Sequence, residues 1–345
     1  MMKKRDNTFD MVKGIAILLV IIGHTAKGFG LLIPVISSFH MPLFFIVSGY
    51  FYKEKNFFDL LKRDSKSLLL PYLLVSVLFI IYGIVTGIWQ HNPDKAVFWI
   101  DAFLKAGKDE CAIGPLWFLL AMFWCRLFYN LLFRLVKKIT INPAIYMVFI
   151  SYPILLITTF TPPHSQSINY LCIMHGMTGM FYFSLGYLAK EYRQRFVLPK
   201  KNHCFVLLAF FTACFSIAHS LGTSLIFFKH YAVYTVLASV SSTYLIYKFC
   251  QKFRPENKNI LVWYGRLSLV VFCMHTIIFR IVPIERVLES GLNISNLYLN
   301  SFLVTLFHII ISILFCIISE RSRVLSYLFN IKSSKNVPIS NNPSI

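Results

Sequence analysis

Charged residues are scarce in this chain, and acidic residues are the scarcest of them. Asp, Glu, Lys and Arg together make up 14% of its 345 residues, whereas a soluble domain carries about 25%. The longest polar connector, about residues 90–113, is too short to form a soluble domain. By contrast, 57% of the residues are hydrophobic and the mean hydropathy is +0.65. The recurring apolar runs predict helices that cross a lipid bilayer, each needing roughly 20 mostly apolar residues.

The sequence has no CxxC pair and no spacing typical of metal ligands. Of its eight cysteines, only Cys111 falls in a clear loop. The other seven lie inside or at the edge of apolar runs: Cys125, Cys172, Cys204, Cys214, Cys250, Cys273 and Cys316. We therefore expect no disulfide framework and no metal site, and we interpret these cysteines as small apolar residues.

The N-terminal segment lacks the cleavage site of a secretory signal peptide. Its apolar run contains Lys13 and His24, and no small-residue cleavage site follows. We interpret the run as a retained helix with its N-terminus in the cytoplasm. The net charge of +20 does not indicate nucleic-acid binding, because the basic residues cluster in short loops between apolar runs. That distribution is typical of the positive-inside rule for membrane proteins.

The apolar runs predict an all-α, polytopic transmembrane helix bundle of about ten spans with both termini in the cytoplasm. The outer loops then hold few basic residues: Lys27, Lys95, Lys105, Lys108, Lys229, Arg280 and Arg286. We expect one membrane domain over residues 1–331, in a multi-pass protein of the cell (inner) membrane, and a disordered polar tail over 332–345. The predicted spans are 12–30, 33–52, 68–88, 114–133, 141–160, 170–189, 204–221, 230–249, 260–281 and 300–319.

The first span carries three ionisable residues close to one face. Lys13 and His24 are eleven residues apart, which at about 100° per residue returns to nearly the same face, roughly 16 Å further along the helix. Asp10 falls near that face too. Because an ionisable group at membrane depth costs about 2.5–3.5 kcal/mol, each is a functional candidate. The alternative is a snorkelling Lys13 and a His24 that is hydrogen-bonded to a neighbouring helix.

The second span contains Pro42, which removes a backbone donor and tends to kink or break a helix. His40 then lies at an irregular outer end, where it is either functional or a cap for that irregularity. Ser48 and Gly49 are better explained by helix packing.

Three further groups of polar residues follow in later segments. The inner loop with Arg63 and Lys66 suits an anionic ligand such as a nucleotide phosphate, although the positive-inside rule explains most of its charge. Trp117 opens the fourth span near the outer face, where aromatic belts are common, and Arg126 lies deeper in that helix and needs a partner.

The last two spans contribute three more polar residues. Ser268 and His275 are seven residues apart and so share one face of the ninth span. His308 stands alone in the tenth span, and we expect it to be a packed polar residue.

Taken in order, these segments resemble the acyltransferase 3 family of membrane acyltransferases, and most closely its fucose 4-O-acetylase-like branch. The resemblance rests on "FDMVKGIAILLVIIGH", "FHMPLFFIVSGYFY", the basic loop ending "LLLPY", "GPLWFL" and "GRLSLVVFCMH", which cover most of the chain collinearly. The family pattern of a basic residue, ten intervening residues and a histidine maps to Lys13 and His24. Many members have arginine instead of lysine at the first position, which weakens a strict phosphate-clamp role for Lys13. Many also carry an attached soluble domain that is not found here, so a partner enzyme would be a separate chain.

The resemblance implies transfer of an acyl group, usually acetyl from acetyl-CoA, to a hydroxyl of a cell-surface or lipid-linked glycan. Catalysis is then expected from His24, as general base or as a transient acetyl-histidine, and from His40. The candidates for donor binding are Asp10, Lys13, Arg63 and Lys66. The candidates for acceptor positioning are Trp117, Ser268 and His275, with His40 as a further one. No bound cofactor, metal or nucleic acid is expected.

Three alternatives remain open at this stage. The first is a transporter or exporter of a glycan or small molecule, typically marked by broken helices in both halves; the sequence indicates one Pro-interrupted span. The second is a family member that modifies or helps to export an adhesive polysaccharide. The third is a transferase that uses a longer acyl group, such as succinyl.

Overall fold

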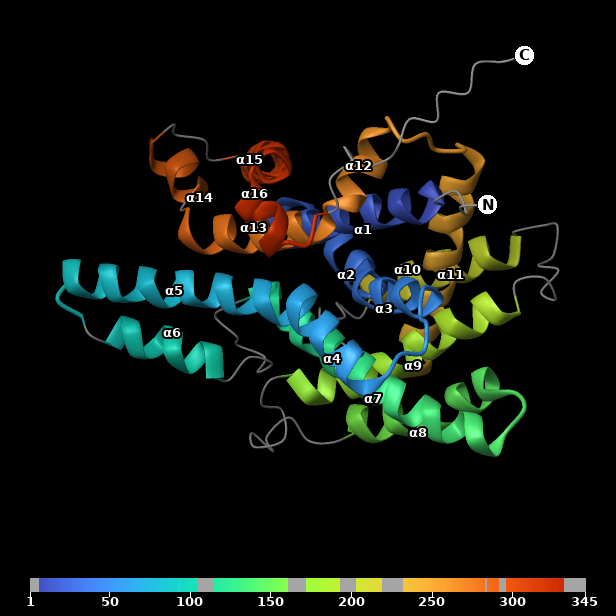
Figure 1. Ribbon diagram of the computed structural model, residues 1–345. Coiled ribbons are helices and arrows are strands. Elements are labelled where there is room, and N and C mark those ends of the chain that lie inside the picture. The colour runs from blue at the N-terminus through green and yellow to red at the C-terminus, as the bar shows by residue number, and fades with distance from the viewer. Residues whose placement is uncertain are drawn as a thin grey trace, which may run out of the picture.

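The computed structural model describes residues 6–92, 94–104, 114–160, 172–192, 203–218, 232–282, 284–291 and 296–331. Throughout these ranges every regular element is helical (Figure 1). Each predicted span coincides with one helix or one interrupted pair: α1 (Asn7–Thr25), α2 (Leu32–Ser37) with α3 (His40–Tyr50), α5 (Leu70–Trp89), α7 (Trp117–Ile139), α8 (Pro143–Phe160), α9 (Ile173–Glu191), α10 (His203–Ala218), α11 (Ala232–Lys252), α12 (Ile260–Arg266) with α13 (Ser268–Ile281), and α15 (Leu297–Arg321).

The all-α prediction is confirmed, together with helices suited to a bilayer. Within the described ranges, five helical stretches are long and apolar enough to cross a membrane, or six if the bent pair α12–α13 is one span. α8 and α10 are apolar but shorter. The count of ten spans and the cytoplasmic termini stay predictions.

Two helices outside the predicted spans adjoin α5, and one of them, α6, forms with it an arm that projects from the bundle (Figure 1). α4 (Phe57–Asp64) continues into α5 through η2 (Ser65–Leu69), a π-helical turn. α6 (Asp94–Leu104) packs back along α5, with the Trp99 ring stacked on Phe79 at 4.9 Å between centroids. Gly83 makes room for Trp99, because a Cβ there would overlap the indole ring. Part of the expected connector 90–113 is therefore helical.

α1 lies at the centre of the fold and contacts α2, α3, α11, α12, α13 and α15. Its crossing with α12 is close because both helices have glycine at the contact. A Cβ on Gly14 would overlap the Leu261 carbonyl, and one on Gly265 would overlap the Asp10 carbonyl. Gly49 and Gly186 make the same kind of contact between α3 and α9. In a bilayer the hydrophobic effect does not drive helices together, so their association depends on the close van der Waals packing that small residues allow.

Two of the spans are interrupted. The break between α2 and α3 falls at residues 38–39, just before Pro42. A proline in the interior of a helix would remove a hydrogen bond, whereas in the first turn its missing N–H is tolerated. Pro42 occupies the first turn of α3, so the helix begins shortly before it. The break between α12 and α13 falls at Leu267, where the chain bends by 78°. The sequence predicts the first interruption through Pro42 and carries no proline at the second.

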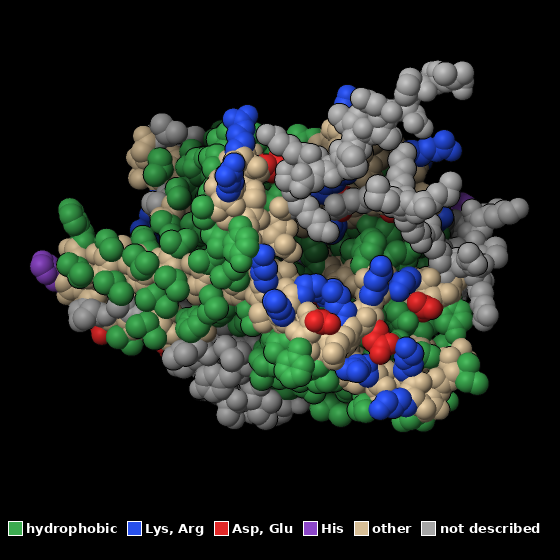
Figure 2. All heavy atoms as spheres, viewed as in Figure 1, with side chains coloured by type: hydrophobic (Ala, Val, Ile, Leu, Met, Phe, Trp, Pro, Cys, Tyr) green, Lys and Arg blue, Asp and Glu red, His purple; other side chains and the backbone are tan. Residues whose placement is uncertain are grey.

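The surface is divided between apolar and basic regions. α5 presents exposed aliphatic side chains along its length, including Leu73, Val77, Ile81 and Val85, as expected for contact with lipid. Lys and Arg side chains gather on the face drawn in Figure 2, over α4, α16 (Arg323–Leu328) and the end of α7. The exposed ones in these segments include Lys62, Arg134, Lys137, Lys138 and Arg323.

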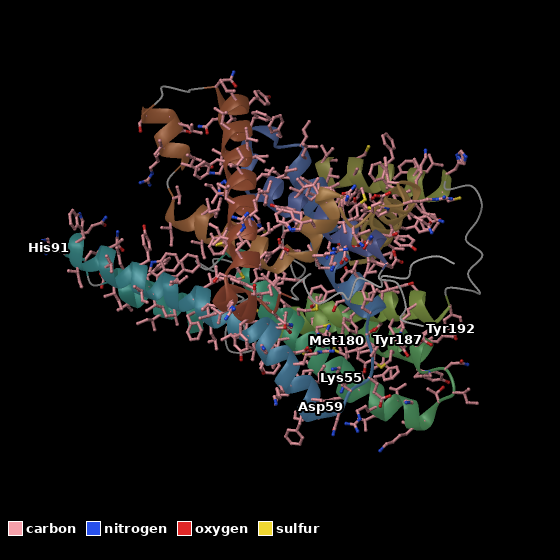
Figure 3. The ribbon with its side chains drawn as sticks, turned by 45° about the horizontal axis from the view of Figure 1, so that its top comes forward. Lys55, Asp59, His91, Met180, Tyr187 and Tyr192 are labelled. Carbon is pink, nitrogen blue, oxygen red and sulfur yellow. The ribbon has the colours of Figure 1, made fainter. Side chains whose placement is uncertain are left out.

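Loops that were predicted to lie on opposite sides of the membrane are far apart in the structure. Lys55 and Asp59, from a loop expected in the cytoplasm, lie far from His91, which comes from a loop expected outside (Figure 3). His91 ends the long α5 arm. The seven cysteines that the structure describes form no disulfide with one another, and Cys111 lies outside the described residues.

Candidate active site

Asp10 holds two cations at the N-terminal end of α1. It is 4% exposed and pairs with Lys13 Nζ at 2.8 Å and with Arg266 Nε at 3.4 Å. The Arg266 guanidinium also donates to the side-chain oxygens of Asn7, at 2.9 Å, and Asn257, at 2.5 Å. One buried carboxylate thus pairs with two basic side chains, so Asp10, Lys13 and Arg266 together carry a net charge of +1. The predicted neighbourhood of Asp10 and Lys13 is present in the structure.

Arg266 was not singled out from the sequence. It reaches Asp10 because α12 packs on α1 through Gly14 and Gly265. The bend at Leu267 then directs α13 away from α12. The motif "GRLS" contains the arginine, but only the helix crossing reveals its carboxylate partner.

His24, near the C-terminal end of α1, begins a row of three imidazoles. Its ring centroid lies 5.4 Å from that of His275 on α13, which lies 5.5 Å from that of His308 on α15. Phe279 lies 6.0 Å from both His24 and His275. His275 is fully buried and His308 is 1% exposed. The histidine that looked isolated in the sequence therefore contacts a candidate site residue.

The hydrogen bonds of the row are incomplete. His308 Nδ1 lies 2.8 Å from the Val304 carbonyl, to which it donates, and His308 Nε2 has no partner. Neither nitrogen of His275 has a partner. A buried polar group without a partner costs about 1–3 kcal/mol. Such an arrangement is typical of a site that is completed by substrate or water.

Ser268 does not share this contact. It is the first residue of α13, two turns before His275, so the two are separated by about 10 Å along the helix axis. They lie on one face, as predicted, but the structure does not bring them together.

His40 is held by its own chain at the start of α3. It is 5% exposed, and its Nδ1 donates to the Ile36 carbonyl at 2.8 Å. This bond spans the break between α2 and α3. The capping interpretation of His40 thus has a structural basis, and its Nε2 remains the nitrogen through which it can act on a substrate.

Trp117 opens α7 and packs against a histidine that the sequence reasoning missed. Its ring centroid lies 4.7 Å from that of His175 on α9. His175 is 4% exposed and its Nδ1 has no partner. Trp117 therefore has a specific polar neighbour. A tryptophan that only belongs to an interfacial aromatic belt does not need such a neighbour.

Asp64 provides the partner that Arg126 was expected to need. Arg126 Nε donates to Asp64 Oδ2 at 2.6 Å, and its other end donates to Ser48 Oγ at 3.1 Å. Arg63 Nε donates to Asp64 Oδ1 at 2.9 Å. Asp64 is 3% exposed, so the two guanidinium groups balance a buried carboxylate. Ser48 therefore does more than allow helix packing.

Lys66 lies near this network but has a different partner. Its Nζ stands 3.8 Å from the centre of the Tyr327 ring on α16, a cation–π contact. The four candidates for donor binding therefore occur in two groups. Asp10 and Lys13 are on α1, whereas Arg63 and Lys66 are on α4 and η2.

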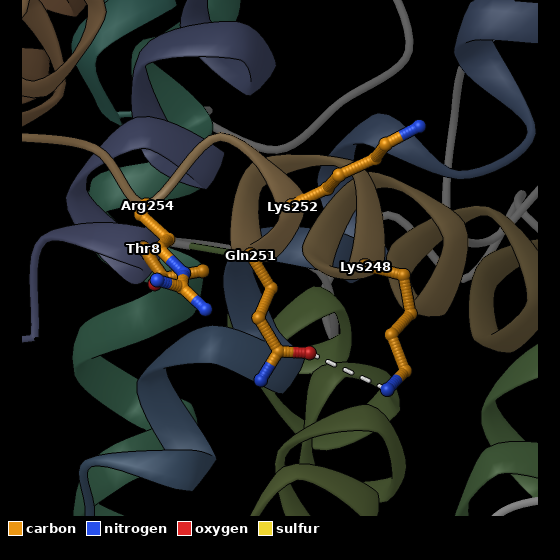
Figure 4. A pocket seen from close by; sticks show the side chains of 5 residues that line it. All are labelled: Thr8, Lys248, Gln251, Lys252 and Arg254. Carbon is orange, nitrogen blue, oxygen red and sulfur yellow. Dashed lines mark hydrogen bonds between the residues drawn. The ribbon is translucent and has the colours of Figure 1, made fainter.

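A basic pocket opens beside the N-terminal end of α1 (Figure 4). It has a volume of about 630 Å³ and is lined by Thr8, Lys248, Gln251, Lys252 and Arg254. Lys248 donates to Gln251 at 3.3 Å, and no acidic side chain is among the lining residues. The pocket adjoins the Asp10 network, since Asn7 Nδ2 donates to the Pro255 carbonyl at 3.1 Å. Three cations around one opening suit an anionic group.

The fold and these buried ionisable groups define a helical membrane protein with polar sites inside its bundle. A family model described as an acyltransferase domain, Acyl_transf_3, matches residues 6–321. The chain therefore belongs to the acyltransferase 3 family and is a membrane acyltransferase. The search of curated proteins and the search of solved structures gave no match. The resemblance to this family is confirmed, and the fucose 4-O-acetylase-like branch stays a prediction.

Proposed function

We propose that the protein is an O-acetyltransferase of the cell (inner) membrane. It moves an acetyl group from cytoplasmic acetyl-CoA to a hydroxyl of a cell-surface glycan, such as an O-antigen, capsule or exopolysaccharide unit. The observation that carries this proposal is on α1. One helix bears a paired cation, Lys13, at one end and a histidine, His24, eleven residues further on, where it contacts His275.

The anionic head of acetyl-CoA is held at the basic inner end. Lys13 and Arg266 already share one carboxylate, and their excess positive charge attracts phosphate oxygens. The neighbouring pocket with Lys248 and Arg254 offers further positive charge for the same head. Arg63 and Lys66 form a second basic group on the next cytoplasmic segment. The flexible pantetheine arm then carries the thioester along α1 towards His24.

The chemistry requires one base and one acceptor hydroxyl. His24 takes the hydroxyl proton as the oxygen attacks the acetyl carbonyl, the C–S bond breaks, and the CoA thiolate receives the proton. General-base catalysis of this kind is typically worth about 10²–10⁴-fold. In the alternative route His24 attacks the thioester itself, and the acceptor then removes the acetyl group from the imidazole.

The acceptor is positioned by side chains at the other end of the bundle. His275 has unpartnered nitrogens beside His24, and Trp117 stands against His175. Aromatic rings and imidazoles suit a sugar, which has an apolar face and hydroxyls that donate and accept. His40, with its Nδ1 bonded to the backbone, contributes through Nε2.

Two other functions draw on specific observations. A transferase of a longer acyl group uses the same residues, because nothing in the donor contacts depends on the acetyl methyl. A transporter or exporter is favoured by irregular helices in both halves of the chain: the two-residue break between α2 and α3, and the 78° bend between α12 and α13. The family match supports the enzyme, and the interrupted helices then line the substrate path.

Deletion of the gene followed by mass spectrometry and NMR of the cell-surface glycan tests the proposal. Loss of an acetyl group from one sugar position, restored by the intact gene, is the expected result. Loss of a succinyl group instead would identify the longer-chain transferase. An unchanged glycan that accumulates inside the cell would favour the exporter.

A further inference from the structure

Three imidazoles from three different helices lie next to one another inside the bundle, those of His275 and His308 buried and that of His24 half-buried. His24 comes from α1, His275 from α13 and His308 from α15, with His275 in the middle. His275 and His308 bury essentially their whole side chains. Apolar side chains would fill this space at lower cost in a bilayer, so the row needs an explanation other than packing.

The spacing of the rings fits a chain of N–H···N hydrogen bonds. An imidazole nitrogen lies about 1.1 Å from the ring centre, and an N···N hydrogen bond spans about 2.9 Å, so bonded rings in one plane have centroids about 5.1 Å apart. The separations of 5.4 and 5.5 Å are close to this value. The His275 ring is tilted by 33° to that of His24 and by 60° to that of His308. Its terminal torsion is soft, so the ring can turn towards these neighbours.

The last ring of the row has a fixed proton. His308 Nδ1 must be the protonated nitrogen, because it faces the Val304 carbonyl at 2.8 Å and a carbonyl only accepts. In the neutral ring, His308 Nε2 therefore carries a lone pair, and it has no partner. His275, with both nitrogens unpartnered, can donate to His308 Nε2 through one and accept from His24 through the other.

The charged side chains that the structure describes around the row lie beyond its ends. Glu285 interacts electrostatically with His308 and is paired with Lys27 at 2.7 Å. Arg266 on α12 precedes His275 by nine residues and is held by Asp10. α5 and η3 (Gly114–Leu116), which also pack against α13, bring no charged residue to it. On α1 the charged residues are Asp10 and Lys13, and on α15 they are Glu320 and Arg321, at the inner ends of both helices. Among the described residues no group of His, Cys, Asp or Glu is arranged to hold a metal ion.

We propose that His24, His275 and His308 form a proton-sharing row, in which His275 is the positioning residue that holds His24 in its reactive tautomer. This inference rests on the proposed function. When His24 takes the proton of the acceptor hydroxyl, its second N–H moves to His275, and the N–H of His275 moves to His308 Nε2. The positive charge is thereby spread away from the reacting atoms. As the C–S bond breaks, the protons return and His24 delivers one to the CoA thiolate. Acetyl-CoA and an alcohol give an ester and CoA thiol, with no net proton gained or lost.

The test replaces His275 with Gln, which keeps a donor and an acceptor but cannot carry a proton through the ring. Membranes from cells that make the glycan are supplied with radiolabelled acetyl-CoA, and label in the glycan is measured against pH in H₂O and D₂O. The matched control is Thr276→Val. Thr276 is fully buried on the same helix and donates only within it, to the Phe272 carbonyl at 3.0 Å.

We expect His275→Gln to lower kcat about 10- to 100-fold, to leave the KM for acetyl-CoA within about twofold, and to shift the pH profile. We expect His308→Gln to give a smaller loss, and Thr276→Val to behave as the wild type. A solvent isotope effect that reflects more than one proton should fall to a single-proton value in His275→Gln.

Two results overturn the row and are distinguishable from each other. Wild-type kcat and pH profile in His275→Gln, while His24→Ala is inactive, would leave the proposed function standing and make His275 structural. Unlabelled glycan with the wild-type protein would remove the proposed function, and the row with it.

Discussion

Substitution of Lys13 by Ala should weaken the use of acetyl-CoA while sparing the chemical step. Lys13 Nζ pairs with Asp10 at 2.8 Å and its side chain is 26% exposed. If Lys13 also contacts a donor phosphate, its loss removes a partly screened charge contact. A unit-charge pair at 4 Å is worth about 4 kcal/mol at an effective dielectric constant of 20. Sharing with Asp10 and exposure to water reduce this to about 1 kcal/mol.

A loss of about 1 kcal/mol corresponds to a roughly fivefold higher KM for acetyl-CoA. The assay measures initial rates of labelled acetyl transfer in membranes at varied acetyl-CoA, with the acceptor glycan at a fixed level. Lys27→Ala is the matched control, because Lys27 follows α1 at its other end and pairs with Glu285 at 2.7 Å. Lys13→Arg keeps the charge and adds a planar fork, so its KM should equal or fall below that of the wild type.

The reasoning is refuted if the KM for acetyl-CoA is unchanged in Lys13→Ala. It is also refuted if Lys27→Ala raises that KM equally, since the effect would then not depend on the inner end of α1. A lower amount of inserted protein without a change in KM would assign Lys13 to folding alone.

Three further predictions concern the inner face and the helix crossings. Asp64→Asn leaves Arg126 without its carboxylate and should lower the free energy of unfolding by about 3 kcal/mol, measured by denaturation in detergent. The control Asp59→Asn changes an exposed carboxylate and should have no effect. Equal stabilities of the two variants would contradict the account of Asp64 and Arg126 as a buried ion pair. Gly265→Val should separate α12 from α1 and abolish both stability and activity. Gly30→Ala should be tolerated, because a Cβ at Gly30 meets no atom within 4 Å. A stable and active Gly265→Val variant would disprove the close crossing of the two helices. Charge removal at Lys248 and Arg254 together should raise the KM for acetyl-CoA, and a normal KM in that double variant would exclude the pocket from donor binding.

Much of the fold was predictable because apolar length is a local property of the sequence. Every predicted span overlaps a helix or an interrupted pair, although the first one, 12–30, is displaced by five residues from α1. α6 was missed because its apolar run is short and is bounded by Asp94, Lys95 and Asp101, and because it is held on α5 by the contact of Trp99 with Phe79. The bend at Leu267 was missed because it has no proline or glycine at the break itself.

The candidate site was predictable only where its residues share one helix. Asp10 and Lys13 are three positions apart, and the structure pairs them as the helical period predicts. Arg266 was overlooked and His308 was expected only to be a packed polar residue, because their partners are on other helices, 256 residues away in the case of Arg266 and Asp10. Single-helix periodicity places a side chain on a face, whereas the neighbour of that face is decided by the packing of the whole bundle.

The role of His24 in acetyl transfer is tested most directly by His24→Ala in cells that lack the chromosomal gene. Acetate bound to the purified cell-surface glycan is measured, with inserted protein quantified in the same cells and His203→Ala, an exposed histidine at the start of α10, as the control. We expect no glycan acetate with His24→Ala, normal acetate with His203→Ala, and equal amounts of both proteins in the membrane. Normal acetate with His24→Ala would contradict the assignment of His24 as the catalytic base.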